Sequence, residues 1–190
     1  MTIREAIALI QPAIDLLPRK EHPHQWADLG CGTGLFTEAL AGLLPEGSTI
    51  YGVDTRSQLR EYSTANGIII RPVIADFVKD ALPYSPLDGI LMANSLHYVN
   101  DKPALLQKLR AGMRADAPLL LVEYDIDKPV PAWVPYPISY ALLKETLGSN
   151  YEVHKLGERH SAYGRGKMYA AIAIPTPPIH SPGSRKTAAS

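Results

Sequence analysis

Residues 26–34 read Trp26-Ala27-Asp28-Leu29-Gly30-Cys31-Gly32-Thr33-Gly34, an apolar run that leads into three alternately spaced glycines. Apolar residues then recur on one helical face from 35 to 44. This order predicts a strand, a tight turn and a helix. Glycines in such a turn let the backbone bend sharply and let a ligand lie directly against it. Because ligands of open α/β sheets bind at the carboxyl ends of the strands, the turn is a candidate binding loop.

The same alternation of apolar runs and helical patterns continues along the chain. Further strands are predicted at 49–54, 68–70, 89–94, 119–123, 151–156 and 167–174. Further helices are predicted at 57–66, at 104–113 and up to about residue 147. Strands without polar alternation, separated by helices, indicate a parallel sheet covered on both faces. The short link before the last strand suits a hairpin. The expected fold is therefore an α/β three-layer sandwich, with a mostly parallel seven-stranded sheet whose last strand is antiparallel and helices on both faces.

One domain is predicted for residues 1–174, followed by a disordered tail at 175–190 that is rich in proline, serine and threonine. An amphipathic helix within residues 1–20 opens the domain and bends at Pro12. Pro72 places the third strand at a sheet edge. Residues 163–167 have the Tyr-x-x-x-Lys spacing of short-chain dehydrogenases, but two glycines disfavour a helix there, so this stretch is predicted as the hairpin turn.

The composition is that of an ordinary globular protein, with 190 residues, 46% hydrophobic and 20% charged. Nineteen basic residues balance nineteen acidic ones. Without a basic stripe, a nucleic-acid partner is not expected. The single cysteine fits a reducing compartment, and no run approaches the ~20 apolar residues of a membrane span. The start lacks a hydrophobic segment of signal-peptide length, and His22 and His24 lack a second ligand cluster. The sequence predicts a cytoplasmic protein with no membrane segment and no metal site.

The glycine spacing separates two families of binding loops. The dinucleotide fingerprint Gly-x-Gly-x-x-Gly fails because position 35 is leucine. The acid followed by alternating glycines resembles the first motif of class I S-adenosylmethionine-dependent methyltransferases of the small-molecule type. The resemblance implies S-adenosylmethionine as cofactor, with its methionine half against this loop, and gives five candidate cofactor-binding residues: Asp28, Gly30, Cys31, Gly32 and Gly34. Glycines used only for turn geometry are the alternative.

Two later acids follow strands in the order that the resemblance expects. Asp54 ends the second strand, where a carboxylate accepts hydrogen bonds from both ribose hydroxyls. A helix cap is its alternative role. Asp76 and Phe77 follow the third strand and supply an acceptor and a flat apolar surface, which an adenine edge and face require. A loop aspartate beside a core phenylalanine is the alternative for this pair.

The segment 91–99 resembles the fourth-strand region of the family, whose end faces both cofactor and acceptor. Asn94 is expected to line the methionine side of the pocket. His97 is the candidate catalytic residue, a general base that removes a proton from a hydroxyl or amine acceptor. An ordinary half-buried histidine is its alternative. Tyr98 departs from the second histidine that such enzymes often carry.

Residues 128–140 carry four prolines and three aromatic residues. This segment is predicted either to form part of a lid, with Trp133, Tyr136 and Tyr140 shaping an acceptor pocket, or to pack a helix onto the sheet. The expected function is in-line methyl transfer to a small or medium organic acceptor. Two alternatives stay open: a related nucleoside-cofactor enzyme, and a non-catalytic cofactor-binding partner or regulator on the same fold.

Overall fold

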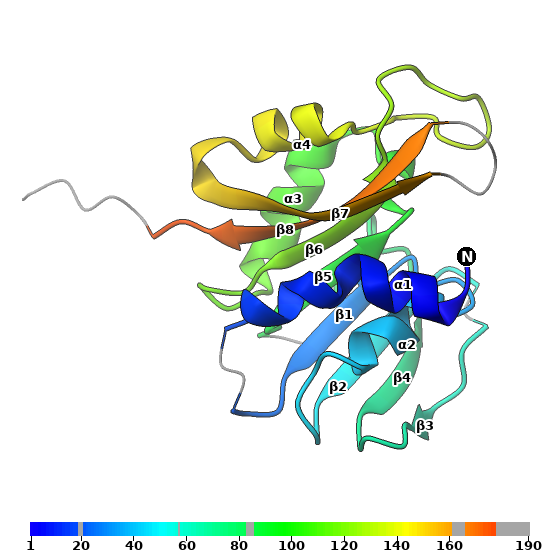
Figure 1. The fold of residues 1–190 in the computed structure, drawn as a ribbon, viewed down its shortest axis with the longest axis vertical. Coiled ribbons are helices and arrows are strands. Elements are labelled where there is room, and N and C mark those ends of the chain that lie inside the picture. Colours follow the sequence, from blue (N-terminus) through cyan, green and yellow to red (C-terminus); the bar gives the residue numbers. More distant parts are fainter. Residues whose placement is uncertain (19–20, 57, 83–85, 161–165, 178–190) are drawn as a thin grey trace, which may run out of the picture.

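The computed structural model describes residues 1–18, 21–56, 58–82, 86–160 and 166–177. Within them, eight strands form one mixed sheet in the order β3-β4-β2-β1-β5-β6-β8-β7 (Figure 1). The strands are β1 Gln25–Leu29, β2 Thr49–Asp54, β3 Tyr62–Ser63, β4 Ile69–Ile74, β5 Gly89–Ala93, β6 Leu119–Tyr124, β7 Tyr151–His160 and β8 Lys167–Pro175. The predicted α/β fold is confirmed, with one strand more than expected.

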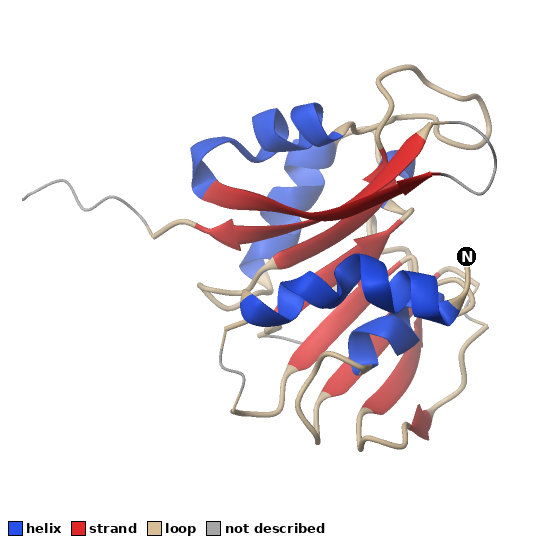
Figure 2. Cartoon of the chain, viewed as in Figure 1, coloured by secondary structure: helices blue, strands red, loops and turns tan. Residues whose placement is uncertain are grey.

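Helices cover both faces of this sheet (Figure 2). They are α1 Ile3–Ile10, α2 Leu35–Ala41, α3 Lys102–Ala111 and α4 Tyr140–Leu147, with short 3-10 helices at Gln11–Asp15, Leu96–Tyr98 and Gly148–Asn150. The helices α1 and α2 share one hydrophobic cluster with the sheet, whereas α3 and α4 pack into a second cluster on the other face. The predicted three-layer arrangement is therefore confirmed. The bend expected at Pro12 is the change from α1 to a 3-10 helix.

Successive residues of the central strands alternate between these two clusters. On β1, Trp26 lies in the cluster with α1 and α2, and Ala27 lies in the cluster with α3. Such burial on both faces is why these strands are apolar throughout. The indole of Trp26 lies over Gly89 of the neighbouring strand, where a Cβ would come within 2.3 Å of the ring.

The sheet topology places the ends of three strands together. Strand β1 pairs in parallel with β2 on one side and with β5 on the other, so the chain order reverses at β1. Open α/β sheets bind ligands at such a switch point, at the carboxyl ends of the strands. Leu29, Asp54 and Ala93 end these three strands at the same edge. This edge is where the candidate site is expected.

The predicted hairpin is present. Strand β8 runs antiparallel to both β6 and β7. It extends to Pro175, and the backbone N–H of Thr176 donates to the carbonyl of Asn150 over 2.9 Å. The predicted turn at 163–167 falls largely outside the described residues, as does most of the predicted tail, from 178 to 190. None of the described helices is both long enough and apolar enough to cross a bilayer.

The helix predicted at 57–66 is wrong. Two residues of this stretch form β3 and pair antiparallel with Ile69 and Ile70 of β4. Gly67, expected to end a helix, lies instead in the turn that joins the two strands, with its N–H donating to the carbonyl of Thr64. The stretch offers few apolar residues for a helical face, and Leu59 is used to pack against the glycines of the binding loop and β2. Strand β4 is consequently next to the edge strand rather than at the edge, and β3 covers only its first two residues.

Candidate active site

The glycine loop between β1 and α2 is fastened to the end of β2. The N–H groups of Gly30 and Cys31 both donate to the carbonyl of Val53, over 2.8 and 3.1 Å, and the Gly34 N–H donates to the carbonyl of Cys31 over 2.8 Å. Gly30, Gly32 and Gly34 have φ angles of 81°, 53° and 87°, a region that favours glycine. Alternating glycines are thus required by the turn itself.

A buried carboxyl lies at the end of β1, below this loop. Asp28 accepts a hydrogen bond from the hydroxyl of Thr37 in α2 over 2.6 Å, while its other oxygen, Oδ1, is buried without a hydrogen-bond partner. Burial raises the pKa of Asp28 to about 7, and the nearby carboxylate of Asp54 adds to this rise. The unpartnered Oδ1 of Asp28 therefore favours a neighbour that donates a hydrogen bond or carries positive charge.

The pKa of Asp28 makes a testable difference to stability. Because its folded-state pKa lies above the ordinary value of 3.8, the folded protein binds more protons than the unfolded chain between pH 4 and about 7. Stability should therefore fall as the pH rises through this window, by at most about 4 kcal/mol, and then level off. Asp28→Asn should remove most of this slope in urea unfolding measured from pH 4 to 8. The exposed Asp127→Asn is the matched control; equal slopes in both variants would contradict the assignment.

A cavity of about 500 Å³ lies at the carboxyl edge of the sheet, beside the glycine loop. It is lined by Gly30, Asp54, Thr55, Asp76, Phe77, Val78, Lys79, Asn94, Ser95, Tyr98 and Val99. Five predicted site residues are therefore brought together here: Gly30, Asp54, Asp76, Phe77 and Asn94. Five others do not line this cavity: Asp28, Cys31, Gly32, Gly34 and His97. These five surround or support the loop and the strand ends instead.

Asp54 joins the second strand to the glycine loop. Its carboxylate accepts a hydrogen bond from the Gly32 N–H over 3.0 Å and another from the Arg56 N–H, also over 3.0 Å. Each carboxylate oxygen has further lone pairs directed to other donors. The side chain thus fastens the loop and still lines the cavity.

Asp76 and Phe77 form the opposite wall. The carboxylate of Asp76 accepts the Val78 N–H over 3.0 Å and lies 2.9 Å from the ammonium of Lys79. The hydrogen bond from Lys79 is the main cause that lowers the pKa of Asp76. The cavity wall therefore presents a fixed carboxylate beside an aromatic ring, with one exposed cation next to it.

Asn94 follows β5 in an unusual backbone conformation. Its φ of 56° lies in the left-handed region, which few residues other than glycine adopt and which asparagine enters more readily than most. Its Oδ1 is buried without a hydrogen-bond partner, although the residue lines the cavity. The next residue, Ser95, donates its hydroxyl to the carbonyl of Leu29 over 2.6 Å and ties β5 to β1. Asn94 therefore presents an unsatisfied acceptor beside the glycine loop.

His97 is more deeply buried than the sequence indicated. It is 1% exposed, and its Nδ1 lies 2.6 Å from Oε2 of Glu123, which is also 1% exposed. Nδ1 is therefore the ring nitrogen that bonds the carboxylate, and Nε2 is the one directed away from it. Nε2 is buried without a partner. The histidine ring lies 4.4 Å from the ring of Tyr98, which does line the cavity.

Cys31 has a structural environment. Burial, together with the carboxylates of Asp28 and Asp54, raises the pKa of its thiol to about 12, so it is a poor nucleophile. Its backbone fastens the loop, as described above. Among the described residues, no group of three or more histidine, cysteine, aspartate or glutamate side chains is arranged to bind a metal ion.

The aromatic side chains of residues 128–140 do not line the cavity, and two of them pack against other rings of the domain. The ring of Trp133 meets the ring of Tyr124 edge-on at 5.9 Å, and the ring of Tyr140 meets Tyr169 of β8 at 5.5 Å. The backbone N–H of Tyr136 donates to the carbonyl of His97 over 3.0 Å. None of the three predicted aromatic residues lines the 500 Å³ cavity. The alternative of packing onto the sheet describes Tyr140 best.

Six lining residues were not predicted: Thr55, Val78, Lys79, Ser95, Tyr98 and Val99. Each lies within two positions of a predicted residue, so extending each motif by two positions would have found them. The pairing of His97 with Glu123 was also missed. Its signal is a single charged residue in the otherwise apolar run of β6, which indicates a buried partner.

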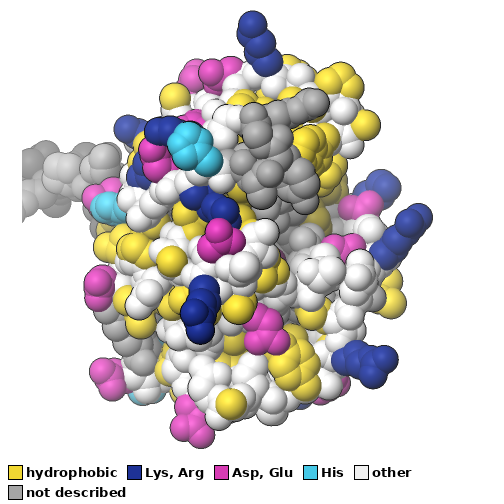
Figure 3. Space-filling view, turned by 45° about the vertical axis from the view of Figure 1, so that its right-hand side comes forward, with side chains coloured by type: hydrophobic (Ala, Val, Ile, Leu, Met, Phe, Trp, Pro, Cys, Tyr) yellow, Lys and Arg dark blue, Asp and Glu magenta, His cyan; other side chains and the backbone are white. Residues whose placement is uncertain are grey.

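A larger cavity of about 630 Å³ lies elsewhere, between α3, α4 and the paired ends of β7 and β8. It contains none of the predicted site residues, so size alone does not identify the active site. On the face shown in Figure 3, basic and acidic side chains are interspersed and no patch of one sign stands out. This distribution agrees with the net charge of zero.

Comparison with known proteins assigns the family. Residues 3–164 match a family model described as a methyltransferase domain. Among solved structures, 1,6-didemethyltoxoflavin-N1-methyltransferase from Burkholderia thailandensis is 18% identical with a TM-score of 0.64, over 92% of this chain and 81% of that one. Magnesium protoporphyrin IX methyltransferase from Synechocystis is 17% identical with a TM-score of 0.61, over 92% and 78%. A methyltransferase from Aquifex aeolicus is 16% identical with a TM-score of 0.61, over 92% and 97%. No functionally curated protein matches the sequence.

At these identities the solved structures establish the fold, and the family model, which spans most of the chain, establishes the family. Both agree with the glycine loop, the strand order and the cavity at the switch point. The predicted resemblance is therefore confirmed: the chain belongs to the methyltransferase domain family, as a class I methyltransferase.

Proposed function

We propose that this enzyme binds S-adenosylmethionine in the 500 Å³ cavity and transfers its methyl group to a small or medium organic acceptor. The observation that carries the proposal is the convergence of Gly30, Asp54, Asp76 and Asn94 on one cavity at the switch point of the sheet. The Burkholderia structure contains S-adenosylhomocysteine and 1,6-didemethyltoxoflavin, and the Synechocystis structure contains S-adenosylmethionine. A cytoplasmic location stays a prediction.

The lining residues fit this cofactor. Asn94 lines the cavity and has a side-chain oxygen without a partner, so a rotation of its amide would bring an acceptor to the cationic methionine half. Asp54 supplies a carboxylate for the ribose hydroxyls, and Asp76 with Phe77 supplies an acceptor and a flat surface for adenine. A Cβ at Gly32 would meet no atom within 4 Å, so the loop has an open side there. The cavity therefore offers acceptors where the cofactor carries donors and positive charge.

The chain itself mainly has to position two molecules. When bound, S-adenosylmethionine supplies a methyl group that its cationic sulfonium has already activated. The cavity walls orient the acceptor in line and exclude water, and positioning of this kind contributes ~7–11 kcal/mol to lowering a barrier. Tyr98 and Val99 also line the cavity and follow Asn94 in the chain. These residues are proposed to contact the acceptor.

His97 is proposed as the base through Nε2, because Glu123 occupies Nδ1. Access to the buried Nε2 requires a neighbouring side chain to move. Tyr98 is the exposed neighbour, with 54% of its surface accessible and its ring against the imidazole. Displacement of the Tyr98 ring by an acceptor would open this path.

His97→Asn should lower the single-turnover rate by about 10²–10⁴-fold. Asparagine is chosen because its amide nitrogen takes the position of Nδ1 and still donates to Glu123, whereas alanine would leave Oε2 of that buried carboxylate without this donor. Rates would be measured against pH by rapid quench. An unchanged rate and profile would remove His97 from the chemistry and leave it a structural role.

The function itself is tested by binding and turnover on the purified protein. Calorimetry with S-adenosylmethionine, its decarboxylated form and NAD separates a methyltransferase from a related nucleoside-cofactor enzyme. A cofactor-consumption assay with a metabolite library then identifies acceptors. Indifference to S-adenosylmethionine would refute the proposal, whereas tight binding without turnover of any acceptor would favour the non-catalytic partner or regulator.

A further inference from the structure

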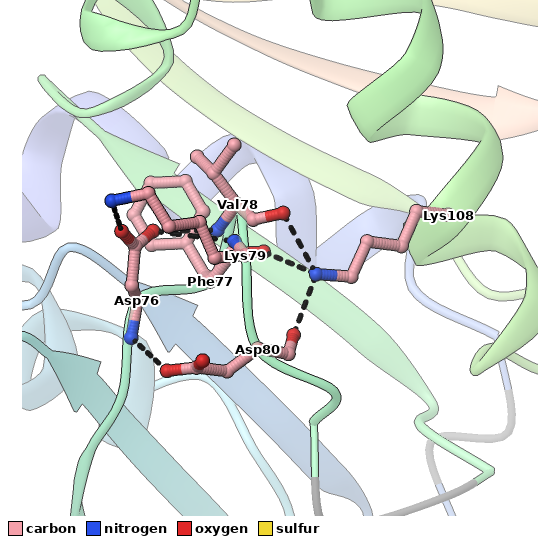
Figure 4. Close-up of polar contacts among 6 residues, drawn as sticks. All are labelled: Asp76, Phe77, Val78, Lys79, Asp80 and Lys108. Atoms are coloured by element: carbon pink, nitrogen blue, oxygen red, sulfur yellow. Dashed lines mark hydrogen bonds and ion pairs between the residues drawn. The ribbon is translucent and has the colours of Figure 1, made fainter.

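The cavity wall at residues 76–80 depends on a lysine from a distant helix. Lys108 extends from α3 to this loop, and its ammonium donates to the carbonyls of Phe77, Val78 and Asp80 over 3.1, 2.9 and 2.5 Å (Figure 4). An ammonium has three N–H donors, so these three bonds use all of them. Lys108 does not line the cavity.

Four backbone N–H groups of the loop, those of Asp76, Val78, Lys79 and Asp80, are satisfied from within it. The carboxylate of Asp76 accepts the N–H of Val78, and the carboxylate of Asp80 accepts the N–H of Asp76 over 2.8 Å. The N–H groups of Lys79 and Asp80 donate to the carbonyl of Asp76 over 3.0 and 2.7 Å. These N–H groups thus bond to the carbonyl and the acidic side chains of the loop itself, while three other carbonyls converge on Lys108 (Figure 4). The loop is a tight turn whose outward carbonyls need one external cation.

We propose that Lys108 is a positioning residue for cofactor binding, because it fixes the loop from Asp76 to Asp80 and with it one wall of the cavity. Four residues of this loop line the cavity: Asp76, Phe77, Val78 and Lys79. All three contacts of Lys108 are to the backbone, so it sets the conformation of the loop whatever side chains the loop carries. The inference rests on the proposed function, since it assigns the loop to the cofactor.

The same helix carries a second lysine that serves as a matched comparison. Lys102 donates its ammonium to the carbonyls of Val99 and Tyr136 over 2.9 and 2.8 Å. It fastens α3 by the same chemistry, but neither carbonyl belongs to the loop 76–80, and the cavity residue that it holds, Val99, is proposed to contact the acceptor rather than the cofactor. Binding of S-adenosylhomocysteine and of adenosine, measured after removing each lysine in turn, therefore separates a local effect on that loop from a general loosening of α3.

The experiment compares Lys108→Met with Lys102→Met and wild type. Lys108→Met should raise the Kd for S-adenosylhomocysteine and the KM for S-adenosylmethionine by about tenfold, with kcat changed less than about twofold. Affinity for adenosine alone should fall by a similar factor, because the loop faces the adenosine half. Lys108→Arg, which keeps a cation at the carbonyls, should restore part of the affinity. Lys102→Met should leave the Kd for S-adenosylhomocysteine within about twofold of wild type.

Three outcomes would overturn the inference. Unchanged affinity in Lys108→Met, with wild type binding normally, refutes the role of Lys108 and leaves the proposed function intact. An equal loss of affinity in Lys102→Met indicates a general loosening of the helix. Loss of melting temperature in Lys108→Met without a change in Kd assigns the lysine a structural role only. Absence of binding in wild type itself refutes the proposed function instead.

Discussion

Asp54→Ala is expected to raise the Kd for S-adenosylhomocysteine by about a hundredfold or more. A charged hydrogen bond contributes ~1.5–3 kcal/mol, and the proposed ribose contact consists of two such bonds. The substitution also removes the acceptor of the Gly32 N–H, so the glycine loop loses the contact that orients it toward the cavity. Titration calorimetry with S-adenosylhomocysteine measures the effect.

The fold should survive this change. Asp54 is at the end of its strand and only half-buried, and β2 keeps its backbone pairing with β1 and β4. Asp54→Asn is the matched variant, because its amide oxygen still accepts one hydrogen bond without the charge. We expect an intermediate Kd for it. Wild-type affinity in Asp54→Ala, with an unchanged melting temperature, would show that this carboxylate is not in the cofactor site.

The features that the sequence predicted are those with a local physical cause. Positive φ angles require glycine, so the turn after β1 was visible from its three glycines alone. Strands buried on both faces are apolar throughout, so the parallel sheet was visible from runs such as Leu119–Tyr124. Asp54, Asp76 and Asn94 follow directly from such runs, and the carboxyl ends of parallel strands meet at one edge. Local signals therefore located half of the predicted site residues on the cavity.

The features that the sequence did not predict depend on which segments meet in space. The contacts of Lys108 with a loop some thirty positions earlier in the chain, and of His97 with Glu123, have no periodic signal. A two-residue strand such as β3 is too short to show a period, and a partner strand decides whether it forms. The helix predicted at 57–66 failed for this reason, because helix propensity is weak compared with tertiary packing.

For His97, the sequence located the residue but not its hydrogen-bond partner. Its place after β5 was predicted, but its environment was not, because Glu123 comes from the neighbouring strand β6. Burying two titratable groups costs free energy unless both are hydrogen-bonded, and here His97 and Glu123 bond each other. Glu123 also accepts the backbone N–H of His97 over 3.2 Å. The dyad is therefore rigid, and any catalytic use of Nε2 depends on motion around it rather than of it.

Gly30→Ala is expected to destabilise the protein by about 3 kcal/mol and to abolish measurable cofactor binding. A Cβ at this position would come within 2.5 Å of the Cβ of Ser95, a distance that real atoms do not adopt, so the loop or the start of the segment after β5 must shift. The φ of 81° adds a cost of ~1–2 kcal/mol for an L side chain. Overpacking contributes a further ~1–3 kcal/mol. Urea unfolding measures the stability, and calorimetry measures the binding.

Gly32→Ala separates the cost of the backbone conformation from the cost of the clash with Ser95. Its φ of 53° imposes a similar backbone penalty, but no atom lies within 4 Å of the added Cβ. It should therefore destabilise the protein by only ~1–2 kcal/mol, while the methyl group projects into the open side of the loop and weakens cofactor binding. Ser95→Gly alone should destabilise the protein because it loses the hydroxyl bond to Leu29, but Gly30→Ala should cost less in the Ser95→Gly background than in wild type, because the atom that clashes is gone. Equal stabilities for Gly30→Ala and Gly32→Ala would show that the contact between the loop and Ser95 is not tight, and that the shape of this wall has another cause.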